Sequence, residues 1–165
     1  KGPFDRIVTV GFMEHLGRKF YKTFFKILNK LMTDDGIALC HTIGSIEPPG
    51  DVQPFIQKHI FKGGTVPSLS ELIKPIESSG LILGDIEFII KHYDKTLKIW
   101  LERFLKNKEK AKFLYNKEFV RMWEFYLASC SASFKFRDLV VFQLQIIKNF
   151  GALPSNRRDY IYSNN

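Results

Sequence analysis

The chain has 165 residues, of which 45% are hydrophobic and 15% aromatic, a composition that excludes disorder and favours one globular domain with a buried core. No apolar run approaches the ~18 residues of a membrane-spanning helix, and two distant cysteines indicate neither a disulfide framework nor a zinc site. The net charge is +8, but no helix-turn-helix, zinc-finger or RNA-binding signature accompanies it, so we expect no nucleic acid.

The first part of the chain is predicted to form a strand, a helix and a second strand. Phe4–Val10 is apolar on both faces toward its end, which is typical of a central parallel strand. A helix follows, because one side of the next segment collects apolar side chains: Phe20, Phe24, Ile27, Leu28 and Leu31. After a turn at residues 34–36, residues 37–43 are predicted as a second buried strand. The unit is then β-α-β, which implies a parallel strand pair.

The middle of the chain is less regular. Prolines and glycines in residues 44–67 predict a long irregular loop. Ser68 and Glu71 have the spacing of a capping box, which would open a short helix that Gly80 ends. Residues 81–91 are predicted as another strand.

Two aromatic helices and a last strand are predicted after Tyr93. The first helix runs to about residue 104, and a charged linker at residues 106–112 leads to the second, over residues 116–134. Residues 140–147 are predicted as a strand, and the polar tail of residues 154–165 is predicted to lie on the surface. Strands that alternate with helices in this way indicate an α/β fold.

Five ordered motifs span nearly the whole chain. They lie at residues 4–17, where an apolar strand runs into Gly-x-x-Glu-His, and at residues 41–45, 61–68, 92–100 and 121–137. In order and separation they resemble the cyclopropane-fatty-acyl-phospholipid synthase family, which is similar to the mycolic acid methyltransferases. The resemblance implies the C-terminal half of a seven-stranded, Rossmann-like methyltransferase fold that uses S-adenosylmethionine. It also implies a helical insertion, residues 93–135, that shapes an acyl-chain pocket.

The glycine-rich loop of such a fold has no counterpart in the sequence. The chain opens at Lys1, and no Gly-x-Gly turn precedes the first strand or occurs elsewhere. A cofactor-binding turn needs glycines so that the backbone can approach the ligand. We therefore expect residues 1–165 to form a single-domain fragment without the cofactor-loop half, and Phe4–Val10 to form an exposed sheet edge.

The implied reaction transfers one carbon from S-adenosylmethionine to the cis double bond of an unsaturated phospholipid acyl chain and closes a cyclopropane ring. The alkene is a weak nucleophile and a carbocation forms, so the site needs an apolar slot and one held base. Two alternatives stay open. The chain is a non-catalytic remnant or lipid-binding module, or it belongs to an acyl methyltransferase that closes no ring.

Candidate catalytic residues follow from the resemblance. In the family the base is a bound bicarbonate, and its ligands match Glu14, His41, Tyr93 and the backbone amide of Ile43. Gly11 and Glu14 are the positions expected near the cofactor, and no metal is implied. Without the resemblance we would favour plain structural roles, with Glu14 as a helix-start acid, His41 as a core histidine and Tyr93 as a packed aromatic.

Cys130 is a further candidate, since the matching cysteine has been regarded as a nucleophile in the family. Here it lies on an apolar stripe with Phe119 and Tyr126, where a thiol behaves as a small hydrophobe. Methyl transfer from a sulfonium needs no covalent enzyme intermediate, so we favour packing. Trp100 and Trp123, with Phe119 and Tyr126, are candidates to line the acyl slot, although we favour an ordinary core role for most of them.

The basic charge suits a phospholipid partner. Basic residues are attracted to anionic lipid headgroups, although a solvated lysine surface explains the charge equally well. With the resemblance, we expect an anionic membrane surface and unsaturated acyl chains as partners, and a cytoplasmic protein peripheral to the inner membrane surface. A homodimer is compatible with the sequence.

Overall fold

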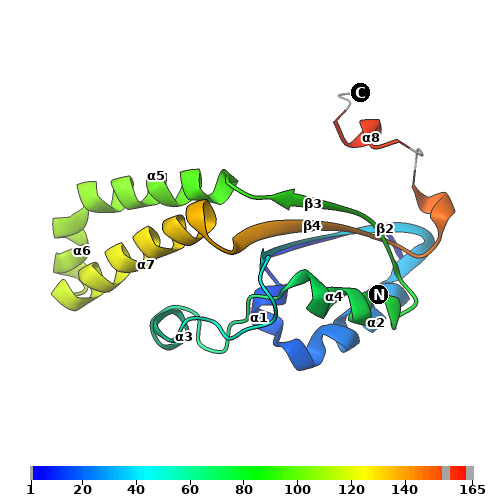
Figure 1. The fold of residues 1–165 in the computed structure, drawn as a ribbon, viewed down its shortest axis with the longest axis horizontal. Helices are drawn as coiled ribbons and strands as arrows, with labels where there is room; N and C mark the ends of the chain where they lie inside the picture. The colour runs from blue at the N-terminus through cyan, green and yellow to red at the C-terminus, as the bar shows by residue number, and fades with distance from the viewer. Residues whose placement is uncertain (1, 154–156, 163–165) are drawn as a thin grey trace.

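The computed structural model describes residues 2–153 and 157–162, and it is built around a four-stranded sheet with the order β1-β2-β4-β3 (Figure 1). β1 (Phe4–Val10) and β2 (Met32–Ser45) are parallel, as predicted. β4 (Leu139–Ile147) lies between β2 and β3 (Ile82–Ile89) and runs antiparallel to both. The α/β class is confirmed, and the sheet is mixed.

The β1–β2 crossover holds α1 (Met13–Leu16), a 3-10 turn (Arg18–Phe20) and α2 (Tyr21–Leu31). The predicted turn at residues 34–36 is wrong, because these residues belong to β2. The register steps from Phe4 opposite Met32 to Arg6 opposite Ile37, so the extra residues of β2 bulge out of the ladder.

A first core lies under the sheet, between β2 and the helices α2 and α4 (Leu69–Glu77). Phe25 of α2 and Leu72 of α4 are fully buried there. The predicted capping box is present, with the Ser68 N–H donating to Glu71 Oε2 over 2.9 Å. Gly80, with φ of 71°, follows this helix in the left-handed conformation that favours glycine.

The predicted irregular loop contains one further helix, α3 (Pro54–His59). The Gln53 side chain accepts hydrogen bonds from the N–H groups of Phe55 and Ile56, and Pro54 stands at the first position. The loop prediction is therefore wrong over these residues. The proline that indicated irregular structure instead begins a helix.

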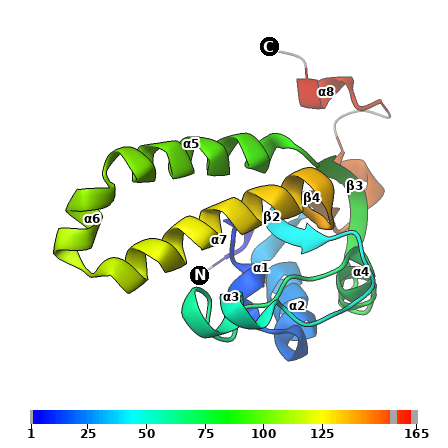
Figure 2. The same ribbon diagram turned by 60° about the vertical axis from the view of Figure 1, so that its left-hand side comes forward.

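α5 (His92–Lys106) and α7 (Lys117–Phe136) form a long hairpin that projects from the sheet (Figures 1 and 2). The charged linker predicted between them is wrong, since α6 (Lys108–Leu114) occupies it. Lysine, alanine and leucine are good helix formers, so a lysine-rich sequence indicates solvation and does not exclude a helix. α6 lies at the end of the hairpin remote from the sheet (Figure 2).

The described end of the chain packs on the sheet. A 3-10 turn (Phe150–Ala152) follows β4, and α8 (Asp159–Tyr162) lies in the segment predicted as a polar tail, of which residues 154–156 and 163–165 lie outside the described residues. The Tyr160 hydroxyl donates to Gln145 Oε1 over 2.7 Å, and Arg158 pairs with Asp85 at 2.8 Å.

β1 forms one edge of the sheet and, among the described residues, pairs with β2 alone. Val8 and Val10 are exposed, whereas Ile7 packs on the first core. An apolar edge of this kind is open to pairing with further chain. Within residues 2–153 and 157–162, no helix has the length and hydropathy to cross a bilayer.

Candidate functional site

Glu14 lies where β1 ends beside β2. Val10, the last residue of β1, stands opposite His41, and the Gly11 N–H donates to the His41 carbonyl over 2.9 Å. Gly11 then turns the chain with φ of 64°, in the region that favours glycine. α1 follows at once, with Met13 fully buried, so Glu14 is held over the carboxyl end of β2.

Beyond the end of β1, the Glu14 carboxyl group serves as the hydrogen-bond acceptor for β2. Its Oε1 accepts the N–H of Ile43 over 2.7 Å, a β2 donor that lies beyond the end of β1. Its Oε2 is the one buried side-chain polar atom without a hydrogen-bond partner in the described part of the chain. Burying such an atom unpaired costs about 1–3 kcal/mol, so its environment fits a ligand that donates a hydrogen bond.

The loop before α4 covers the place where Glu14 of α1 meets Ile43 of β2, which we call the Glu14 corner. The Thr65 N–H donates to the Glu14 carbonyl over 2.7 Å. The Phe61 ring lies 5.8 Å from His15 of α1 and 6.2 Å from Tyr126 of α7, both edge-on. Residues 61–65 therefore connect the Glu14 corner to the helical hairpin.

His41 is oriented by Gln143 of the neighbouring strand. The two residues are register partners in β2 and β4, and Gln143 Nε2 lies 3.1 Å from His41 Nδ1. With the amide nitrogen as donor, Nδ1 accepts, and the neutral ring carries its proton on Nε2. His41 can then donate from Nε2 to a further group.

Tyr93 and Ile43 belong to the same apolar cluster, which lies between the hairpin and the sheet together with Val141. The Tyr93 ring stacks on Phe134 at 5.0 Å and meets Trp100 edge-on at 6.4 Å. The structure gives its hydroxyl no hydrogen-bond partner among the described residues. The structure thus joins Glu14 to Ile43 and Ile43 to the Tyr93 cluster, whereas the roles of these residues stay predictions.

Cys130 packs in that same cluster and is half-buried. Burial raises the pKa of its thiol to about 11, so the thiol is protonated near neutral pH. Burial also raises the pKa of Tyr126 to about 12, with smaller contributions from Cys130 and Tyr93. These surroundings favour the packing interpretation of Cys130 over a nucleophile.

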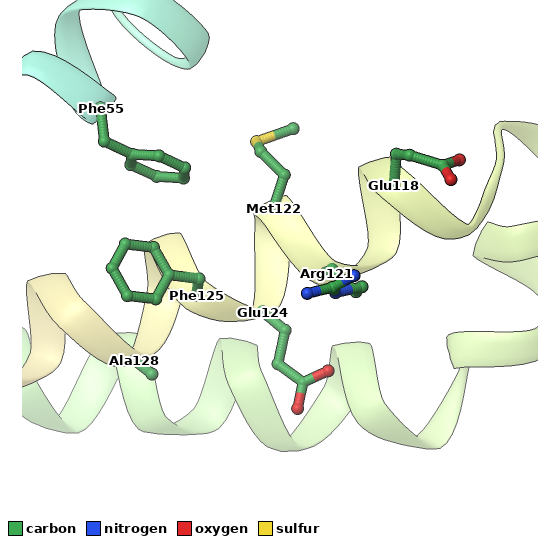
Figure 3. A pocket seen from close by; sticks show the side chains of 7 residues that line it. All are labelled: Phe55, Glu118, Arg121, Met122, Glu124, Phe125 and Ala128. Carbon is green, nitrogen blue, oxygen red and sulfur yellow. The ribbon is translucent and has the colours of Figure 1, made fainter.

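A separate hollow lies on the outer side of α7 against α3 (Figure 3). It measures about 710 Å³, and its lining residues are Phe55, Glu118, Arg121, Met122, Glu124, Phe125 and Ala128. The rings of Phe55 and Phe125 meet edge-on at 4.8 Å. It contains none of the predicted site residues, and the described residues hold no cluster of His, Cys, Asp and Glu suited to a metal ion.

Two parts of the site were not predicted from the sequence: Gln143 and the loop at residues 61–65 that covers the Glu14 corner. Gln143 and Gln145 are the two polar residues of an otherwise apolar strand, and they share one face by alternation. That pattern was a usable signal for Gln143. The position of the loop depends on contacts with α1 and α7 that no local pattern indicates.

The fold is that of an α/β S-adenosylmethionine-dependent methyltransferase. The chain matches roughly half of the length of the solved structures of this class that follow. The cyclopropane synthase MmaA2 from Mycobacterium tuberculosis superposes with a TM-score of 0.80 at 27% identity, covering 88% of this chain and 55% of that chain. The mycolic acid cyclopropane synthase CmaA1, complexed with SAH and CTAB, has a TM-score of 0.79 at 30% identity, covering 88% and 56%.

Residues 1–144 match the family model of mycolic acid cyclopropane synthetase, and the chain belongs to that family. The cyclopropane-fatty-acyl-phospholipid synthase of Escherichia coli (strain K12) is 38% identical over 141 residues, which are 86% of this chain and 37% of that protein. The family resemblance drawn from the motifs is confirmed. The chain spans between a third and somewhat over half of the length of these relatives.

Proposed function

We propose that this protein acts in the transfer of one carbon from S-adenosylmethionine to the cis double bond of unsaturated phospholipid acyl chains, giving a cyclopropane ring. The observation that carries the proposal is the Glu14 corner. There the half-buried Glu14 has one carboxyl oxygen fixed by the Ile43 N–H and the other oxygen buried without a donor, within a chain of the cyclopropane synthetase family. Such a group suits the holding of a base.

We propose bicarbonate as the group held there. When bound, it would supply the base for the proton that ring closure releases. Glu14 Oε2 would accept the hydrogen bond of its hydroxyl, and His41 Nε2 and the Tyr93 hydroxyl would donate to its oxygens. The Ile43 N–H already donates to Glu14, so an anion there would share this donor or displace the carboxyl group from it.

S-adenosylmethionine would supply the electrophilic methyl group. The contribution of this chain is the turn at Gly11, where a Cβ atom would meet nothing within 4 Å. That open space, together with the positive φ, fits a ligand close to the backbone between β1 and α1. Glu14 follows three residues later and is the second residue we assign to this side of the cofactor.

The hairpin would provide the apolar slot for the acyl chain. Its inner side carries a row of aromatic contacts from Phe119 through Trp123 to Tyr126, with centroid distances of 5.8 and 5.1 Å. Tyr126 leads on to Cys130 and Tyr93 in the cluster beside Ile43. An apolar chain along this row would reach the Glu14 corner. We further propose a cytoplasmic protein at the inner membrane surface, either alone or as a homodimer.

The test is lipid analysis with a labelled cofactor. The protein, as expressed from its gene, is incubated with unsaturated phospholipid and S-adenosylmethionine that carries a trideuterated methyl group. The expected product has gained one carbon with two deuterium atoms, since one deuteron leaves with the base, and it shows the upfield proton NMR signals of a ring. Deuterium gain without ring signals would indicate a methyltransferase that closes no ring. Unchanged acyl chains would contradict the proposal and favour a non-catalytic lipid-binding role.

A further inference from the structure

The end of the hairpin exposes consecutive apolar side chains. Phe113, Leu114 and Tyr115 are 89%, 62% and 65% exposed, at the point where α6 ends. Scattered exposed apolar residues are ordinary, but three in succession on a projecting element form a patch. α6 lies at the extremity of the hairpin, away from the sheet (Figures 1 and 2).

Lysines surround this patch. Residues 106–117 contain five lysines and a single glutamate, so much of the excess positive charge of the chain lies in one short segment. Lys108 pairs with Glu124 of α7 at 2.8 Å, and Lys112 lies 3.6 Å from Glu109. The remaining three, which form no ion pair with the described residues, are Lys106, Lys110 and Lys117.

We propose that residues 105–117, the hairpin tip, dock the protein on an anionic phospholipid bilayer. Phe113, Leu114 and Tyr115 would enter the interface between headgroups and acyl chains, and the lysines around them would lie at the lipid phosphates. Tyrosine suits that depth because one end of its ring is apolar and the other polar. The Tyr115 ring also stacks on Phe119 at 4.3 Å, which joins the tip to the aromatic row of α7.

Charge decides between a bilayer and a second copy of the chain. Two tips brought together would oppose lysine to lysine, whereas an anionic bilayer offers both an apolar interior and negative headgroups. The proposal rests on the proposed function only in choosing phospholipid as the anionic surface. Binding to vesicles requires no catalysis, so the two can fail separately.

Vesicle flotation tests the apolar part of the tip. The protein is mixed with vesicles of phosphatidylcholine alone, or of phosphatidylcholine and phosphatidylglycerol in equal parts. The wild-type protein should float with the anionic vesicles and only weakly with the neutral ones. The double variant Phe113→Ser with Leu114→Ser should lose at least about tenfold in affinity, since it removes two apolar side chains from the interface. The matched control is Phe150→Ser, which changes a side chain that is 80% exposed in the turn after β4 and should leave binding unchanged.

A charge-matched pair tests the lysines. Neutralising Lys106, Lys110 and Lys117 by glutamine should weaken binding roughly 10²-fold, about fivefold for each lysine at the surface. The same change at the exposed α2 lysines, Lys22, Lys26 and Lys30, should weaken it far less. Equal losses from both triple variants, or full binding by the serine double variant, would overturn the proposal. A dimer that the serine variant abolishes, with vesicle binding intact, would assign the tip to a second copy. Activity on detergent-dispersed phospholipid should survive in all tip variants, which separates failure of docking from failure of the reaction.

Discussion

Replacing Glu14 by glutamine separates the two oxygens of its carboxyl group. Glutamine keeps a carbonyl oxygen where Oε1 accepts the Ile43 N–H over 2.7 Å, so the link between α1 and β2 persists. At the position of Oε2, the buried atom without a partner, it places an NH₂ group that can only donate. We expect a melting temperature close to that of the wild type and a loss of ring formation of roughly 10²-fold or more, the usual contribution of a positioned acid–base group.

Alanine at the same position removes both functions and so measures the structural one. The Ile43 N–H would be left without its acceptor, at a cost of about 1–3 kcal/mol in the free energy of unfolding. For a chain of this size, that corresponds to a melting temperature lower by roughly 2–12 °C. The alanine variant should therefore lose both stability and activity, and the glutamine variant only activity.

The assay pairs product formation by mass spectrometry with thermal unfolding by circular dichroism, on the protein as expressed from its gene. Added bicarbonate should partly restore a variant that has lost anion affinity and should not restore one that has lost geometry. Wild-type activity in the glutamine variant would remove Glu14 from the proposed site. A glutamine variant as unstable as the alanine variant would show that Glu14 serves chiefly to hold α1 on β2.

Four further outcomes are expected. Cys130→Ser should keep substantial activity and lose about 1–3 kcal/mol of stability, because the thiol packs in an apolar cluster and its pKa is raised to about 11 by burial; an inactive variant of unchanged stability would contradict this. Gly44→Ala should cost about 1–3 kcal/mol in chemical denaturation, since its Cβ would lie 2.2 Å from the Phe142 ring, whereas Gly50→Ala has no contact closer than 3.8 Å and should be neutral. Hydrogen bonds from Lys98 and Ser131 hold the pKa of Asp94 below its ordinary value of 3.8. The ionised carboxylate therefore stabilises the folded chain fully above that pH, and this stabilisation is lost as the pH falls below it. Asp94→Asn should flatten the acid side of a plot of unfolding free energy against pH. Calorimetric titration of residues 1–165 alone should show weak or no binding of S-adenosylmethionine, because the sequence has no glycine-rich loop. Stoichiometric micromolar binding by a monomer would show that such a loop is not needed and would contradict the expectation of an absent cofactor-loop half.

Local patterns predicted the elements better than their partners. Apolar periodicity located β1, α2 and β4 closely, because each buries a face that is visible in a short stretch of sequence. The same patterns do not encode strand direction or order. Nothing within residues 139–147 indicates that the strand lies between β2 and β3 and runs against both.

In the candidate site too, residues in short motifs were predicted, whereas contacts between distant residues were not. Glu14, His41 and Tyr93 were predicted through the family resemblance. The structure places Glu14 in α1 just after β1, His41 within β2 opposite the last residue of β1, and Tyr93 in the first turn of α5. The contact between His41 and Gln143 joins residues 102 positions apart, so it depends on the register of two strands. The error at α6 has another cause, because charge reports contact with solvent and leaves backbone conformation open.

The central position of β4 has a consequence for how the chain is made. β3 pairs only with β4 among the described strands, and the antiparallel partner of Ser45 in β2 is Leu139 of β4. Neither β2 nor β3 can complete its pairing before β4 has been made. The ribosome synthesises the chain from the N-terminus at about 5–20 residues per second, so some 3–12 s separate completion of β3 from completion of β4. During that interval the helical hairpin, whose contacts are local, can form while the sheet beneath it cannot close. The apolar strand β3 is then exposed on the growing chain, and we expect nascent chains that stop within the hairpin to need chaperones.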